Sequence, residues 1–446
     1  MNLLNNKLIN YLYIRYKYDN KYFRNYMKIL KKYEGANRET INSYTITKLK
    51  KMLVYAYENV EFYKERFDKC QFNPYRFEKI DDMNKIPILT KKEIAENKQK
   101  MFSKKYLRRK INKITTGGTT GTPLEFYFSE ESKNVRQGNW AKWKMRANVD
   151  YKYDKFCYIG RILGTDDVWK YSGDVLEIAS NKLTAKNVKK ILKEMEKFKP
   201  VYIQGYASAI YIIATIIKKE NINISKINVK AILTSSDTLF EEYRSVIEEV
   251  FNCKVFDHYG QNEDCVAATE CQEHDGYHIH EESCYIEIVD INTNKSIKDN
   301  IGKLIGTNLY NYAMPLIRYE IGDVGQITEE ICKCGDAHKR IINFQGRIDD
   351  IIKLKNGTRI AAGSLNQPMK YSNREIIECQ YIQDNLENLN VNIVPDVNFS
   401  NDTIKCFEKE LRKLIGETTM NIKFNIVENI PRQPNGKYKF IISKVK

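Results

Sequence analysis

Residues 115–123 read Thr115-Thr116-Gly117-Gly118-Thr119-Thr120-Gly121-Thr122-Pro123, and the strand-like stretch LEFYFS follows them at 124–129. Three glycines let the backbone of such a loop approach a polyphosphate closely, and its hydroxyl and N–H groups can donate hydrogen bonds to phosphate oxygens. The loop lacks the Gly-Lys-Ser/Thr ending of a Walker phosphate loop, so a phosphate-binding lysine must come from elsewhere in the chain. Taken alone, the stretch is equally compatible with an ordinary turn.

The pattern around this loop sets the expected fold class. Residues 1 to about 110 carry apolar residues at spacings of three and four with few Gly or Pro, which predicts a helical lead-in. From about 111 to 346, short apolar runs alternate with amphipathic stretches, as is typical of α/β sheets. After Gly346 the sequence predicts a hairpin turning at Asn356-Gly357, further strands and a helix near 402–416. We therefore expect an α/β chain with a large N-terminal domain at 1–346 and a small, mobile α+β domain at 347–446.

Composition narrows the class of protein. In 446 residues no apolar run approaches the roughly 18 residues needed to cross a bilayer. The opening MNLLNNKLIN has no signal-peptide pattern, so we expect a cytoplasmic enzyme. Ten cysteines spread over this length predict free thiols or metal ligands rather than disulfides. The formal net charge of +16 is not accompanied by a nucleic-acid-binding module, so no nucleic-acid partner is expected.

The N-terminal segment is strongly basic. Its first 33 residues hold eight lysines and arginines against Asp19 alone, interleaved with Leu, Ile, Tyr and Phe. Two interpretations are open: helices packed on the main domain with a solvated basic side, or peripheral contact with the inner membrane face.

Several further motifs follow the glycine-threonine loop in a fixed order. They are Gln204-Gly205-Tyr206-Ala207-Ser208, Thr234-Ser235-Ser236-Asp237, Tyr259-Gly260-Gln261-Asn262-Glu263, Arg318-Tyr319-Glu320-Ile321-Gly322-Asp323, Gly346-Arg347-Ile348-Asp349-Asp350 and Pro431-Arg432-Gln433-Pro434-Asn435-Gly436-Lys437. Upstream lie YAYENVEFYKERF (55–67) and KIPILTKKEI (85–94). Together these motifs resemble the ANL adenylate-forming superfamily, in its phenylacetate-CoA ligase-like and CapK-like (capsular polysaccharide) branch. The resemblance spans roughly residues 47 to 440.

The resemblance implies an ATP site and a set of catalytic residues. The expected nucleotide-binding residues are Thr115, Thr116, Gly117, Gly118, Thr119, Thr120, Gly121, Ser235, Ser236, Asp237, Tyr259, Gly260, Gln261, Asp323 and Arg347. Of these, the 115–121 loop would hold the β- and γ-phosphates, Tyr259 the adenine face and Asp323 the ribose hydroxyls. Lys437, Thr119 and Glu263 are the expected catalytic residues. Lys437 would bridge the carboxylate and the α-phosphate, and Glu263 would hold Mg²⁺.

The same resemblance places a hinge at Asp349, about which the C-terminal domain would rotate between half-reactions. Two stretches depart from the family pattern. Ala361-Ala362-Gly363-Ser364-Leu365 replaces a stretch ending in glutamate, which puts a coenzyme A step in doubt, and Gln433-Pro434-Asn435 alters the tail that precedes Lys437.

We expect Tyr158, Arg161 and Tyr206 to line the acyl pocket.

Histidines and cysteines gather between the adenine motif and the hinge, and all five histidines fall in this interval. The short pairs Cys271-x-x-His274 and Cys332-x-Cys334 predict a structural tetrahedral Zn²⁺ site, with His278 competing with His274 for the fourth place. The alternative is a set of ordinary buried thiols.

These observations predict an AMP-forming ligase that activates a carboxylic acid as an acyl-adenylate in capsular or cell-surface polysaccharide assembly. The sequence does not identify the acid or the oligomeric state. The acceptor is coenzyme A, an amine or a sugar hydroxyl, and the sequence leaves the choice among them open. Two alternatives are an aryl-acid CoA ligase close to phenylacetate-CoA ligase and a catalytically silent nucleotide-binding scaffold.

Overall fold

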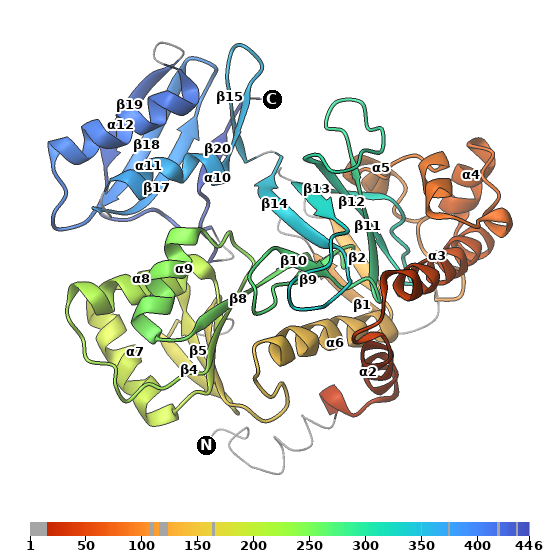
Figure 1. The fold of residues 1–446 in the computed structure, drawn as a ribbon, viewed down its shortest axis with the longest axis horizontal. Coiled ribbons are helices and arrows are strands. Elements are labelled where there is room, and N and C mark those ends of the chain that lie inside the picture. The colour runs from red at the N-terminus through yellow and green to blue at the C-terminus, as the bar shows by residue number, and fades with distance from the viewer. Residues whose placement is uncertain are drawn as a thin grey trace. The chain divides into compact units, whose positions relative to one another are not determined.

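The computed structural model describes residues 16–106, 111–115, 124–162, 166–348, 350–372, 375–416, 420–433 and 436–445. The chain divides into two compact units (Figure 1). Unit 1 comprises residues up to 154 together with 256–321 and 325–344, and unit 2 comprises 155–255, 322–324 and 345–446.

Unit 1 opens with helices whose ends follow local capping signals. They are α2 (Lys21–Tyr33), α3 (Arg38–Asn59), α4 (Glu61–Lys69), α5 (Lys91–Glu96) and α6 (Glu130–Arg146). The Asn37 side chain accepts from the Thr40 amide at the start of α3, and Thr90 and Glu93 form a capping box on α5. Helices α2, α3, α4 and α5 lie within residues 1 to about 110, the stretch for which the sequence predicts a helical lead-in.

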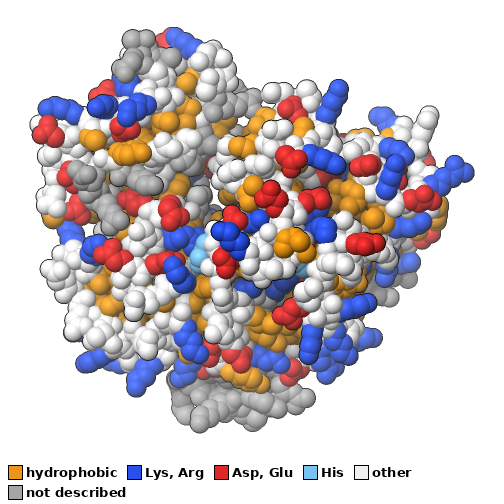
Figure 2. All heavy atoms as spheres, in the orientation of Figure 1, with side chains coloured by type: hydrophobic (Ala, Val, Ile, Leu, Met, Phe, Trp, Pro, Cys, Tyr) orange, Lys and Arg blue, Asp and Glu red, His pale blue; other side chains and the backbone are white. Residues whose placement is uncertain are grey.

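The basic N-terminal helix packs on the body of unit 1. Phe23, Tyr26 and Leu30 of α2 are buried, and the Tyr26 hydroxyl donates to Asn139 Oδ1 of α6 at 2.7 Å. Its lysines and Arg24 are exposed. On the face drawn in Figure 2, Lys and Arg side chains are interspersed with Asp and Glu. Among the described residues, no helix is long and apolar enough to cross a membrane.

The sheet of unit 1 runs in the order β11-β12-β13-β14-β10-β9-β8. Its strands are β8 (Lys254–Gly260), β9 (Ala267–Thr269), β10 (Tyr277–Ile279), β11 (Cys284–Val289), β12 (Gly302–Asn308), β13 (Tyr319–Thr328) and β14 (Arg340–Arg347), and a separate hairpin pairs β1 (Asn112–Thr115) with β2 (Glu125–Phe128). Every residue of β11 and β12 is buried, including Glu287 and Lys303.

Unit 2 holds a sheet covered by helices, parallel except for its edge strand β4, and a smaller α+β part (Figure 1). The sheet runs β7-β6-β3-β5-β4, with β3 (Phe156–Gly160), β4 (Trp169–Ser172), β5 (Val175–Ala179), β6 (Tyr202–Gly205), β7 (Ala231–Ser235) and helices α7 (Ala185–Phe198), α8 (Ala207–Lys219) and α9 (Glu241–Phe251). In α7, Val188, Ile191, Leu192 and Met195 are buried, at the spacing of one helix face.

The chain after 350 forms the smaller part. A hairpin of β15 (Ile351–Lys353) and β16 (Arg359–Ala361) precedes α10 (Ala362–Leu365), α11 (Gln367–Tyr371) and α12 (Asn401–Ile415), and a sheet in the order β19-β18-β17-β20 comprises β17 (Ile376–Gln383), β18 (Asn388–Pro395), β19 (Asn421–Ile426) and β20 (Ile441–Ser443). The predicted α/β class, with an α+β part at the C-terminal end, is confirmed.

Candidate nucleotide and acyl site

Two residues expected at the ribose and phosphates lie together in the short parts of β13 and β14 that belong to unit 2, residues 322–324 and 345–347. Asp323 is a buried residue of β13, and Arg347 ends β14. The Arg347 Nε atom lies 3.4 Å from Asp323 Oδ1, and the Ile348 amide donates to the Gly322 carbonyl at 2.9 Å. Gly322 has a φ of +86°, a backbone conformation that favours glycine. The arrangement presents an ionisable acceptor beside a fixed cation, a combination that suits a hydroxylated, phosphorylated ligand.

The adenine motif lies in unit 1 at the end of β8. The Tyr259 ring centroid is 4.6 Å from that of Phe344 and 6.3 Å from that of Tyr277, so an aromatic cluster holds this ring in place. Glu263 is buried and accepts a 3.4 Å hydrogen bond from the Tyr319 hydroxyl. Gln261 Nε2 is buried and has no hydrogen-bond partner among the described residues. A buried amide donor without a partner is suited to a polar ligand atom.

The expected acyl-pocket residues lie at the carboxyl ends of parallel strands in unit 2. Tyr158 belongs to β3, and Tyr206 directly follows β6 and donates its backbone N–H to the Ile159 carbonyl at 3.0 Å. Tyr158 and Tyr206 share a side-chain hydrogen bond, and burial raises the pKa of both hydroxyls. A Cβ atom at Gly160 would lie 2.5 Å from the Tyr158 hydroxyl oxygen, so a larger residue there would displace the Tyr158 side chain. Ligands of open α/β sheets bind at such strand ends.

The motif that ends in Lys437 lies beside the expected acyl-pocket residues. Gly436 has a φ of +78°, and its carbonyl accepts from Ser180 Oγ at 3.3 Å. A Cβ atom at Gly436 would lie 3.6 Å from the Tyr206 ring and 3.7 Å from Arg161 Cβ. Burial raises the pKa of Asp237, and the Lys437 ammonium lies near enough to oppose that rise. Unit 2 therefore brings together the lysine motif and the predicted residues Arg161, Tyr206 and Asp237.

Comparisons with known proteins show what this chain is similar to. A family model described as the CapK C-terminal domain matches residues 352–444. The chain is 29% identical over 402 residues to protein CapK of Staphylococcus aureus, which covers 88% of this chain and 87% of that protein. It is 25% identical over 336 residues to the phenylacetate-coenzyme A ligase of Thermus thermophilus, which covers 72% and 74% of the two chains. These findings confirm the predicted resemblance to the phenylacetate-CoA ligase-like, CapK-like branch of the ANL superfamily.

A solved structure gives the same fold. A 2-hydroxyisobutyryl-CoA ligase in the postadenylation state matches with a TM-score of 0.71 and 17% identity, over 92% of this chain and 90% of that one. The predicted α/β fold class is thereby confirmed. The predicted enzyme class, an AMP-forming acyl ligase, is confirmed as well.

Asp237 has a structural partner that the sequence did not reveal. Its carboxylate accepts from the Ala207 amide at 2.7 Å and from the Ser208 hydroxyl at 2.6 Å, at the N-terminus of α8. Tyr206, the N-cap residue of α8, supplies no capping side chain itself. Asp237 thus accepts hydrogen bonds at the start of α8, where backbone amides have no partner within the helix. Ser235 ends β7, and Ser236 has a φ of +79°.

An ion pair that the sequence also did not reveal holds the segment around Lys437. The Arg432 guanidinium contacts the buried Glu378 carboxylate of β17 and lies 4.7 Å over the Tyr438 ring. The Tyr438 hydroxyl donates to the Cys379 carbonyl, and Gln380 Nε2 donates to the Lys439 carbonyl at 2.8 Å. The segment on both sides of Lys437 is thereby fastened to one strand. No local signal could have paired residues 54 positions apart.

Part of the predicted site lies outside the described residues. Thr115 ends β1 opposite Glu125 of β2, and residues 116–123 are not described. The roles of Thr116, Gly117, Gly118, Thr119, Thr120 and Gly121 therefore stay predictions, as does the hinge at Asp349.

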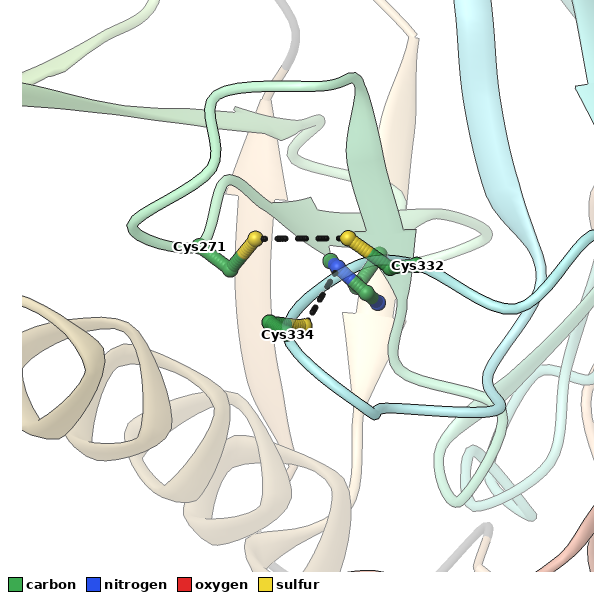
Figure 3. A group of neighbouring side chains, drawn as sticks. Cys271, Cys332 and Cys334 are labelled. Atoms are coloured by element: carbon green, nitrogen blue, oxygen red, sulfur yellow. Dashed lines mark hydrogen bonds between the residues drawn. The ribbon is translucent and has the colours of Figure 1, made fainter.

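The predicted metal ligands are mostly brought together in unit 1 (Figure 3). One ligand atom from each of Cys271, His278, Cys332 and Cys334 lies within 4.8 Å of the other three. We call these four residues the Cys/His cluster. His274 lies outside it, with Nδ1 3.4 Å from Glu270 Oε2. Of the two competing histidines, the fold therefore brings His278 to the cysteines.

Proposed function

We propose that this protein activates a carboxylic acid with ATP, forming an acyl-adenylate and pyrophosphate, and then transfers the acyl group to an acceptor with release of AMP. The observation that carries this proposal is the approach of the Lys437 loop to Tyr206, Arg161 and Asp237. A lysine brought to the carboxyl ends of parallel strands supplies a cation where an anionic reaction needs one.

Each predicted site residue has its own proposed role in this reaction. Lys437 stabilises the charge that develops as a carboxylate oxygen attacks the α-phosphorus and pyrophosphate leaves. Asp323 accepts from the ribose hydroxyls, Arg347 lies beside it, and Tyr259 supports the adenine face. Glu263 is a buried carboxylate that fits Mg²⁺, a hard cation that neutralises phosphate oxygens when bound. Thr115 to Gly121 complete the proposed phosphate site.

We assign the C-terminal residues 347–446 to a lid that moves about Asp349 between the two half-reactions. The first half joins the acid to AMP. In the second, a nucleophile of the acceptor attacks the acyl carbonyl and AMP leaves. A small domain that carries the lysine on a restrained loop is suited to entering and leaving the site as a body.

The proposal also covers the acceptor of the acyl group and the pathway in which the protein acts. Alignment with protein CapK over most of both chains favours a role in capsular or cell-surface polysaccharide assembly, with an amine or sugar hydroxyl as acceptor. The second candidate is coenzyme A as acceptor, which similarity to phenylacetate-coenzyme A ligases favours. Small-molecule substrates of this kind require no nucleic-acid partner.

An acid-dependent ATP–pyrophosphate exchange screen over aryl, amino and hydroxy acids tests the proposal. We expect one class of acid to drive exchange well above the acid-free rate. Adding coenzyme A to the active acid then separates the two acceptors, since only the second candidate forms a thioester. A protein that binds ATP but supports exchange with no acid would instead be the silent scaffold.

A further inference from the structure

The Cys/His cluster is built from three separate stretches of unit 1. Cys271 lies two residues after β9, His278 lies in β10, and Cys332 and Cys334 lie in the loop between β13 and β14 (Figure 3). Cys271, His278 and Cys332 are buried, and Cys334 is exposed. Sequence separations of more than 50 residues make this convergence a property of the fold rather than of chain proximity.

Two distances in the cluster match those of a tetrahedral metal site, and all four ligand atoms lie within 4.8 Å of one another. Zinc binds thiolate sulfur at about 2.3 Å and imidazole nitrogen at about 2.0 Å, so tetrahedral angles place two sulfurs about 3.8 Å apart and sulfur and nitrogen about 3.5 Å apart. The Sγ atoms of Cys271 and Cys332 are 3.7 Å apart, and Cys334 Sγ is 3.6 Å from His278 Nε2. Sulfurs in a disulfide would lie about 2.05 Å apart.

The surroundings of His278 also suit a metal-binding histidine. Its Nε2 atom faces the cysteines, while its Nδ1 atom lies 3.4 Å from Asp336 Oδ2. A metal-binding histidine commonly gives its other ring nitrogen to a carboxylate, which fixes the tautomer and the ring orientation. Asp336 is itself held by contacts with Arg146 and His338. The Asp336 carboxylate therefore lies on the side of the His278 ring where such a partner would be needed, although at 3.4 Å the two atoms form no hydrogen bond in this structure.

We infer that Cys271, His278, Cys332 and Cys334 bind one Zn²⁺ ion in a closed, structural site. Three thiolates and an imidazole suit zinc and exclude Mg²⁺ and Ca²⁺, which prefer oxygen ligands. Four protein ligands leave no open position for a substrate or water, so the ion takes no part in the chemistry of the proposed function.

The site fastens the part of unit 1 that carries the adenine motif. It ties the loops after β9 and β13 to β10, where Tyr277 precedes His278. The Tyr277 hydroxyl donates to Asp257 Oδ2 of β8 at 2.8 Å, and its ring packs near Phe344 and Tyr259. Losing the ion should loosen this aromatic cluster and lower the thermal stability of the protein.

Elemental analysis of the full chain, expressed without a polyhistidine tag, tests the inference. We expect about one zinc ion per chain in the unaltered protein, as four ligands define a single site. Cys271→Ser and His278→Ala should each lose most of this zinc and unfold at lower temperature. His274→Ala is the matched control: it removes the neighbouring histidine of the same segment and should retain the full zinc content.

Cobalt replacement keeps the test decisive where a ligand variant fails to fold. Protein refolded with Co²⁺ should show the intense visible bands of a tetrahedral thiolate site, and addition of Zn²⁺ should abolish them. Zinc far below one ion per chain in the unaltered protein, together with no such cobalt spectrum, would overturn the inference. So would zinc loss in His274→Ala with retention in His278→Ala. Neither readout depends on ligase activity, so failure here leaves the proposed function intact.

Discussion

Lys437→Ala is expected to lower the rate of acid-dependent ATP–pyrophosphate exchange by a factor of about 10²–10³, the usual cost of removing one group that stabilises transition-state charge. The backbone next to Lys437 is restrained by the hydrogen bond from Ser180 Oγ to the Gly436 carbonyl, and Gly436 lies close to the Tyr206 ring. The effect should fall on the maximal exchange rate more than on the acid concentration needed, because the charge that Lys437 meets develops in the transition state.

A neighbouring lysine provides the control. Lys439 lies two residues further along and has its Nζ 3.9 Å from Asp350 Oδ1, a partly exposed pair. Lys439→Ala should change the exchange rate by less than about threefold, because partly exposed pairs contribute about 1 kcal/mol or less. Equal losses in the two variants would mean that charge in the tail, rather than Lys437 itself, supports the reaction.

Arg432→Met is expected to destabilise the C-terminal part by about 3–5 kcal/mol, because removing one partner of a buried ion pair leaves the other charge uncompensated. The Arg432 and Glu378 side chains are 11% and 8% exposed, and Glu378 then has no cation to offset its burial. A urea titration followed by circular dichroism measures this loss. The exchange rate should fall by about 10-fold to 10²-fold as well, since small displacements of a reacting group cost this much.

The double variant Arg432→Met/Glu378→Met separates these two effects. Replacing both partners by apolar side chains removes the unpaired charge, and such replacements are often neutral for stability. We therefore expect recovery of the urea midpoint without recovery of the exchange rate, because the contact between Arg432 and Tyr438 is still missing. Recovery of both would show that Arg432 acts through stability alone.

The elements that local signals specify could be predicted from the sequence. The Asn356-Gly357 turn predicted a hairpin, and β15 pairs with β16 around it. The helix expected near 402–416 is α12, which begins after a Ser400 capping box. Turn residues, caps and apolar spacing act within a few residues, which is why one sequence reveals them.

Contacts across long stretches of chain could not be predicted in the same way. The strand order β14-β10-β9 and the capping of α8 by Asp237 both depend on tertiary placement. The motif residue Arg318 is another example: it forms a buried pair with Glu287 at 2.6 Å, 31 residues away. The choice between His274 and His278 also needed the fold, since spacing alone suits either residue.

The central claim is that the acid becomes joined to AMP, and an isotope measurement tests it most directly. An acid found in the exchange screen is labelled in its carboxylate with the heavy oxygen isotope and incubated with ATP, the protein and an acceptor. We predict that one labelled oxygen appears in the phosphate of AMP, because the attacking carboxylate oxygen stays on phosphorus when the acyl group is transferred. Label in free phosphate accompanied by ADP, or AMP without label, would contradict the account.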